Sequence, residues 1–214
     1  MLRLILLIFI FIFSTSINAF AEPKIIDKPI VWSEYREQLI MEYTQLHYGK
    51  AQNRIIPQAV VIHWTASDTL QSAYNWFYNE SVYEDGTLTL NVASHFMVDR
   101  DGTIYRLTDE TALNRHIIGY NWCAIGIENV GGINGVEDLT SVQLESNVVL
   151  IKYLQKKYPS IEYVFGHYQQ DAARESGLYI ELVPNYYAIK TDPGVNFMNE
   201  LKQRLSFDGL KFFE

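Results

Sequence analysis

Several short apolar runs along the chain predict strands that are buried on both faces. Residues 59–66 form one such run, rich in valine and isoleucine, and residues 124–130 and 163–167 form two more. Continuous apolar runs of about four to eight residues are typical of inner strands in a sheet that is covered on both sides. A histidine, His63, lies at the end of the first run, and His167 ends the third. Glu128 interrupts the second run. Side chains that can bind metal or transfer protons are therefore associated with all three predicted strands.

Other segments repeat their apolar side chains at helical spacing. Helices are predicted over residues 33–48, 68–78, 140–158 and 197–205. Ser33 can cap the first helix and Gly49 can end it, while Thr140 and Gln143 form a capping box at the start of the third. His47, near the end of the first helix, is expected at the surface rather than as a metal ligand.

Strand and helix patterns are interleaved, with one hairpin in the middle of the chain. The hairpin is predicted where residues 93–98 and 103–107 flank a turn that contains Asp101 and Gly102. This order predicts an α/β fold: a single domain with a mixed central β-sheet and helices on both faces.

The first 21 residues have the pattern of a secretory signal peptide. Arg3 precedes an apolar stretch over residues 4–13, and Ala19-Phe20-Ala21 supplies a small-residue cleavage site. We therefore expect cleavage after Ala21, export to the periplasm or the medium, and no stable membrane insertion afterwards. The alternative is an uncleaved anchor, for which the apolar stretch is short compared with the roughly 20 residues of a membrane span.

Composition narrows the possible partners. The chain has 214 residues, 48% of them hydrophobic, and a net charge of −8. An acidic chain without a basic cluster is a poor candidate for binding nucleic acid. Cys123 is the only cysteine, so no internal disulfide can form. We expect a monomer.

Two histidines and one carboxylate are candidates for a zinc site. His63 and His167 follow apolar strands, and Asp192 stands before a proline in the loop 190–194. Two neutral imidazoles and a carboxylate leave a fourth position for water, which is the composition of a catalytic zinc site. A single histidine of this kind is more often a hydrogen-bonded residue of the core or rim. No His-Glu-x-x-His motif or cysteine cluster offers a competing site.

Seven short motifs together resemble a known family. They lie at residues 61–66, 94–96, 99–105, 125–128, 139–143, 166–167 and 190–194. In this order they resemble the type 2 N-acetylmuramoyl-L-alanine amidases, which are related to peptidoglycan recognition proteins. The resemblance covers about residues 60–205. It implies the corresponding amidase fold and a zinc hydrolase that cuts between N-acetylmuramic acid and L-alanine in peptidoglycan or its fragments.

The resemblance also implies site residues. The zinc ligands of the family fall on His63, His167 and Asp192. Its acid/base glutamate falls on Glu128, and the lysine beside its third ligand falls on Lys190. A buried carboxylate such as Glu128 could instead form a structural ion pair, and Lys190 could be a solvated loop residue.

A polar loop before the Glu128 strand is expected to line the substrate groove. Its His116 and Asn121 are the candidate substrate contacts, with ordinary loop polarity as the alternative. Two features depart from the family pattern. Asp192 follows His167 by 25 positions, through an additional loop over residues 175–188, and Ser94 stands where some members have a catalytic tyrosine. The loop is expected to line the groove or to brace the segment that carries Asp192.

The sequence thus predicts three regions: a signal peptide over residues 1–21, an N-terminal extension with one helix over 22–58, and a zinc amidase domain over 59–214. Two other functions remain open at this stage. A recognition protein of the same fold would bind peptidoglycan without cutting it, and a zinc amidase of this fold could act on another amide.

Overall fold

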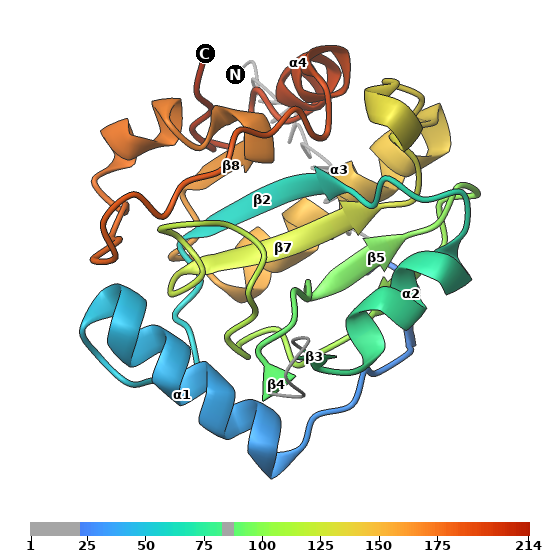
Figure 1. Ribbon diagram of the computed structural model, residues 1–214. Helices are drawn as coiled ribbons and strands as arrows, with labels where there is room; N and C mark the ends of the chain where they lie inside the picture. Colours follow the sequence, from blue (N-terminus) through green and yellow to red (C-terminus); the bar gives the residue numbers. More distant parts are fainter. Residues whose placement is uncertain (1–21, 83–87) are drawn as a thin grey trace, which may run out of the picture.

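The computed structural model describes residues 22–82 and 88–214, so the predicted signal peptide lies outside the described residues. The strands are β1 (Ile25–Asp27), β2 (Ala59–Trp64), β3 (Ser81–Val82), β4 (Leu88–Thr89), β5 (Phe96–Val98), β6 (Ile104–Arg106), β7 (Ala124–Asn129) and β8 (Tyr163–Gly166). The α-helices are α1 (Glu34–Tyr48), α2 (Leu70–Tyr78), α3 (Ser141–Lys157) and α4 (Val195–Arg204). Their order along the chain confirms the predicted interleaving (Figure 1).

Within the described residues, six strands form one mixed sheet in the order β1-β6-β5-β7-β2-β8. The pairs β5–β7, β7–β2 and β2–β8 are parallel, whereas the hairpin β5–β6 is antiparallel. The hairpin turn lies where Asp101 and Gly102 predict it. β1 pairs with β6, so part of the predicted N-terminal extension belongs to the central sheet. The boundary placed between residues 58 and 59 stays a prediction.

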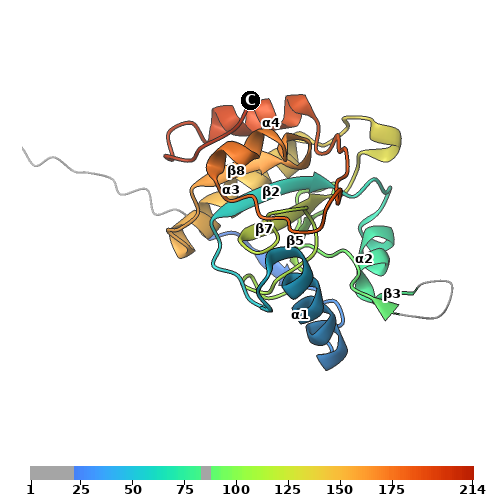
Figure 2. The ribbon, with the colours of Figure 1, turned by 60° about the vertical axis from the view of Figure 1, so that its left-hand side comes forward.

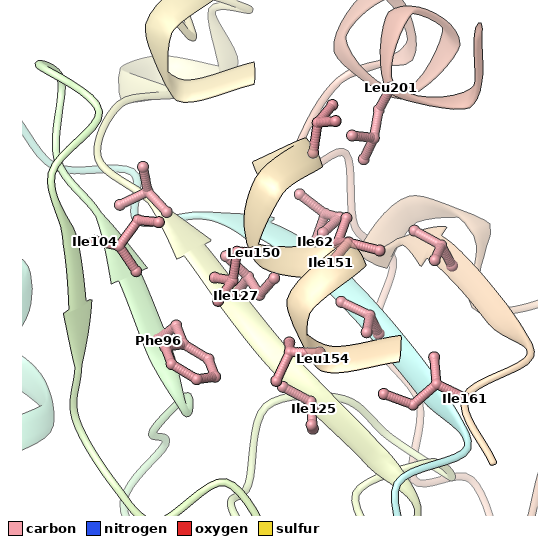
Figure 3. Packing of buried hydrophobic residues seen from close by; sticks show 14 of the residues in the cluster. Ile62, Phe96, Ile104, Ile125, Ile127, Leu150, Ile151, Leu154, Ile161 and Leu201 are labelled. Atoms are coloured by element: carbon pink, nitrogen blue, oxygen red, sulfur yellow. The ribbon is translucent and has the colours of Figure 1, made fainter. Parts of the chain in front are cut away.

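The two faces of the sheet bury different side chains. Ile62, Ile125 and Ile127 face α3 and pack against Leu150 and Leu154 in the largest core cluster (Figure 3). α3 and α4 cover this face, while α1 and α2 lie on the other side (Figure 2). The predicted α/β domain with helices on both faces is therefore confirmed.

Local signals account for the ends of the helices. The Ser33 side chain accepts a hydrogen bond from the backbone of Arg36 at the start of α1, and Gly49 ends the helix in the left-handed conformation. The capping box of Thr140 and Gln143 is formed at the start of α3.

The prediction that His47 lies at the surface is wrong. Its side chain is buried, and its Nδ1 atom lies 2.9 Å from Oε1 of Glu181. Its ring stacks on that of Tyr43, with 4.1 Å between the ring centroids. The chain covers His47 because residues 175–188 return to α1, a contact between distant segments that helical periodicity cannot reveal.

The middle of the loop 175–188 is held by hydrogen bonds to two distant segments, without regular secondary structure over residues 178–188. Trp122 donates its indole N–H to the carbonyl of Leu178, and the backbone of Leu182 donates to the carbonyl of His47. The loop thereby joins α1 to the polar loop that precedes β7.

No helix within residues 22–82 and 88–214 is both long enough and apolar enough to cross a membrane.

Candidate metal centre and active site

His63, His167 and Asp192 converge at the carboxyl ends of parallel strands. His63 lies near the end of β2, and His167 follows β8 directly. Their Nδ1 atoms are 3.0 Å apart, and each lies 3.1 Å from Oδ2 of Asp192. All three residues are buried. Parallel strands place their carboxyl ends at one edge, where loops can supply further groups, so the sheet itself brings the two histidines together.

The three donor atoms fit a zinc ion. Bond lengths of about 2.0–2.1 Å to nitrogen and oxygen put the ligands of a tetrahedral ion roughly 3.3–3.4 Å apart. The observed separations are within a few tenths of an ångström of that spacing. Imidazole nitrogen and carboxylate oxygen are also donors that zinc prefers. The side chains present could therefore hold the ion that the composition of the cluster indicates.

The protonation states of the cluster also suit a cation. Burial lowers the pKa of His63 to about 4, although its hydrogen bond with Asp192 opposes this shift. Burial alone would raise the pKa of Asp192, but the hydrogen bonds with His167 and His63 outweigh it and hold the pKa well below its usual range. A neutral imidazole and an ionised carboxylate are the forms that bind metal.

His116 orients the ring of His63. The Nδ1 atom of His116 lies 3.0 Å from Nε2 of His63, and its own Nε2 lies 3.1 Å from the carbonyl oxygen of Ala124. A carbonyl can only accept, so His116 carries its proton on Nε2 and accepts with Nδ1. His63 then donates from Nε2 and directs the lone pair of Nδ1 toward the cluster. Gly126 makes room for this arrangement, because a Cβ there would lie 2.8 Å from Nδ1 of His116.

Asp192 reaches the cluster after a detour of 25 positions from His167. The backbone N–H of Tyr168 donates to the carbonyl of Asp192 at 2.9 Å, which ties the returning segment to the residue after His167. Gly166 permits the close approach, because a Cβ there would lie 2.7 Å from Pro193. The long interval is therefore compatible with a position beside both histidines.

Glu128 lies next to the cluster and carries an unsatisfied oxygen. It is the register partner of His63 in the parallel pair β2–β7, so both side chains leave the same face of the sheet. Its Oε2 atom is buried without a hydrogen-bond partner among the described residues. Burial raises the pKa of Glu128 well above its usual range; the charge of Asp192 adds to the shift and that of Lys190 opposes it. A buried carboxyl without a partner suits proton transfer better than a structural ion pair.

A cavity of about 490 Å³ opens over these residues. His63, His167, Asp192 and Glu128 lie in its lining together with the exposed Lys190. Trp76 of α2 and Ile189 also line it and are 70% and 83% exposed. Large apolar side chains with this exposure at the rim of a polar cavity are suited to a ligand with apolar surface.

His116 and Asn121, the predicted substrate contacts, are committed to hydrogen bonds within the protein. Asn121 is 1% exposed, and its amide oxygen accepts from the backbone of His116 and Ile117 while its nitrogen donates to Tyr43. His116 lines the cavity but uses both ring nitrogens internally. Their contact with substrate stays a prediction. Ser94, which stands where some family members have a catalytic tyrosine, is buried, and its hydroxyl donates to the carbonyl of Phe96.

The hydrogen bond between His116 and His63 is a contact within the candidate site that the sequence analysis missed. The sequence offered one signal for it, namely Gly126, an unusual residue inside a buried strand that marks a close approach of another group. The identity of that group depends on how the preceding loop folds over the sheet.

The fold and the cluster together define a candidate metal-dependent hydrolase. The family model for N-acetylmuramoyl-L-alanine amidase matches residues 52–194. The chain therefore belongs to the N-acetylmuramoyl-L-alanine amidase family, in its type 2 branch, and the resemblance found in the motifs is confirmed.

Individual proteins agree with this assignment. The endolysin of Enterobacteria phage T3 is 32% identical over 109 residues, which are 49% of this chain and 71% of the endolysin. The chain spans about half the length of other phage endolysins that it matches.

Solved structures share the fold. The endolysin amidase LysCS from Clostridium intestinale URNW is similar with a TM-score of 0.57 and 23% identity, over 90% of this chain and 99% of LysCS. Human PGRP-IβC, solved in complex with glycosamyl muramyl pentapeptide, is similar with a TM-score of 0.51 and 21% identity, over 74% of this chain and 89% of that protein.

Proposed function

We propose that this protein is a zinc-dependent N-acetylmuramoyl-L-alanine amidase, which hydrolyses the amide between N-acetylmuramic acid and L-alanine in peptidoglycan or its fragments. The observation that carries the proposal is the convergence of three metal donors, 3.0–3.1 Å from one another, in the same cavity as the unpaired carboxyl of Glu128. Family membership supports the choice of substrate.

His63, His167 and Asp192 would hold the zinc ion. When bound, the ion supplies Lewis-acid polarisation of the scissile carbonyl and lowers the pKa of water toward neutrality. The hydrogen bond from His63 to His116 keeps the first ligand in one tautomer and one ring orientation, as partners of metal-bound histidines generally do.

Glu128 and Lys190 are the proposed catalytic residues. In its ionised form Glu128 accepts a proton from the attacking water and later delivers that proton to the nitrogen of L-alanine, which leaves as an amine. The charge of Lys190 stabilises the negative charge that develops on the carbonyl oxygen of the substrate. His116 and Asn121 shape the groove, through the hydrogen bonds that order their loop.

The experiment is a digest of purified cell-wall sacculi and of soluble muropeptides with the protein, analysed by mass spectrometry. Release of stem peptides with a free L-alanine amino group, together with a free muramic acid carboxyl group, is the expected result. Tight binding without products would instead indicate a recognition protein. Cleavage of a different amide would indicate another substrate for the same chemistry. The matched control is Glu128→Gln, which keeps the shape of the site.

Action on peptidoglycan requires that the protein reach the wall. We propose export with cleavage after Ala21, to the periplasm or the medium, as a monomer without stable membrane insertion. N-terminal sequencing of protein recovered outside the cytoplasm is expected to begin at Glu22; a sequence beginning at Met1 would contradict this.

A further inference from the structure

Arg115 is a half-buried cation beside the cavity that His63, His167 and Asp192 line. Seven arginines lie in the described part of the chain, and six of them pair with a carboxylate. Arg115 forms no ion pair with any described residue, although the chain has 25 acidic residues against 17 basic ones. One of its terminal N–H groups donates to the carbonyl of Leu90 at 2.5 Å. A guanidinium has five N–H donors, so others remain for a ligand.

The space in front of Arg115 adjoins the cavity that contains the candidate metal ligands. Arg115 lines a second cavity, of about 220 Å³, whose lining also includes His116, His167 and Lys190. These three residues line the metal-site cavity as well. A ligand with its reacting amide near His167 can therefore extend past Lys190 toward Arg115.

Aromatic side chains form the far wall of the second cavity. Tyr43 comes from α1, and Tyr186 and Tyr187 come from the loop 175–188. The wall is braced rather than loose: Asn121 donates to the Tyr43 hydroxyl at 3.1 Å, and the rings of Tyr43 and Tyr186 both pack on His47. Tyr43 lies before the residues that the family model matches, whereas Tyr186 and Tyr187 lie within them.

We propose that Arg115, walled by Tyr43 and Tyr186, binds a free carboxylate on the peptide part of the substrate, beyond L-alanine. A guanidinium can hold a carboxylate through two parallel hydrogen bonds, and partial burial strengthens them. The tyrosine rings supply flat surface for the peptide backbone and side chains. The subsite rests on the proposed amidase function, because it takes the peptide side of the cleaved amide as its ligand.

The test uses two synthetic N-acetylmuramoyl tripeptides that differ in one group. The second residue, joined through its side-chain carboxyl, carries a free α-carboxylate in one and an α-carboxamide in the other; both C-termini are amidated. We expect wild-type kcat/KM to favour the carboxylate by about 10- to 100-fold, which is the range for hydrogen bonds to a charged group. In Arg115→Gln the ratio should fall to about one. Arg204→Gln, which alters an exposed arginine paired with Glu145, is the matched control and should keep the wild-type ratio.

The ratio compares kcat/KM for two substrates of the same protein. A general loss of stability lowers both values equally and leaves the ratio unchanged. An equal loss of kcat/KM on both peptides, or an unchanged ratio in Arg115→Gln, would overturn the proposal. Calorimetric binding of the same two peptides separates the subsite from the chemistry. If wild type cuts neither peptide but binds the carboxylate form more tightly through Arg115, the amidase function is wrong and the subsite stands. Equal binding of both peptides, or of neither, would refute the subsite.

Discussion

The Nε2 atom of His63 lies 3.0 Å from the Nδ1 atom of His116, 53 positions away in the sequence. The carbonyl of Ala124 fixes the direction of this bond, because it leaves His116 only Nδ1 as an acceptor. The side chain of His116 thus determines which nitrogen of His63 is available to a cation.

Removal of this acceptor should weaken metal binding. We expect His116→Leu to lower the affinity for zinc by roughly 10- to 100-fold, the usual effect of losing a partner of a metal-bound histidine. In His116→Asn the amide oxygen can accept in place of Nδ1, so the affinity for zinc should fall by less than in His116→Leu. Competition with a chromophoric chelator measures the dissociation constants. The matched control is His47→Gln, because His47 is also buried but bonds to Glu181, outside the cluster. Wild-type affinity in a folded His116→Leu protein would show that the bond does not position His63.

The cluster should bind one zinc ion per chain. Elemental analysis of dialysed protein is expected to find about one equivalent in wild type and almost none in Asp192→Ala or His167→Ala. Chelation should also lower the thermal midpoint, since a ligand present at 100 times its dissociation constant stabilises the native state by about 2.7 kcal/mol. His47→Gln changes a buried histidine outside the cluster and should keep its zinc. Full zinc content in Asp192→Ala would remove Asp192 from the site.

Glu128→Gln should retain zinc and lose turnover. General-base catalysis contributes roughly 10²–10⁴-fold, so kcat should fall by that factor. Because burial raises the pKa of Glu128, wild-type kcat/KM should increase as pH rises through that elevated pKa. This acidic limb should be missing from the residual activity of the variant. A zinc-loaded variant with near-normal turnover would assign the proton transfer to another group.

The same carboxyl should make the stability of the metal-free protein depend on pH. The pKa of Glu128 is higher in the folded state than in the unfolded chain, so the folded state binds the proton more tightly. The stabilisation is complete below the unfolded pKa and is lost as pH rises through the folded one. In urea unfolding, the free energy of unfolding of Glu128→Gln should therefore increase relative to that of wild type as pH rises above about 4.5. A constant difference between the two proteins across that range would exclude a raised pKa.

Glu181 should be a brace for the loop 175–188. It accepts from Nδ1 of His47 and, at 2.8 Å, from the backbone of Val183, and its side chain is 4% exposed. Glu181→Leu leaves His47 buried without its partner and should lower the free energy of unfolding by about 1–3 kcal/mol. Glu181→Gln keeps an acceptor and should lower the free energy of unfolding by less than Glu181→Leu does. Unchanged stability in Glu181→Leu, measured by denaturant titration, would show that the pair does not hold the loop.

Local chemistry let the sequence predict most elements of the fold. Ser33 and Gly49 bound α1, and Thr140 with Gln143 opens α3, because capping involves residues within one helical turn. The apolar runs of β2, β7 and β8 are legible because strands covered on both faces exclude polar residues. The same reasoning placed His63 and His167 at strand ends, and the motif order assigned Asp192 with them.

Tertiary structure decided the contacts that join distant residues. The pairing of His63 with Glu128 depends on the parallel register of β2 and β7, and the bond to His116 depends on how a loop folds over Gly126. The burial of His47 depends on a partner 134 positions away. Side-chain periodicity reports only which face of its own element a residue occupies. What that face meets is set by packing of the whole chain. This packing put His47 in the interior and placed His116 beside His63, a candidate metal ligand.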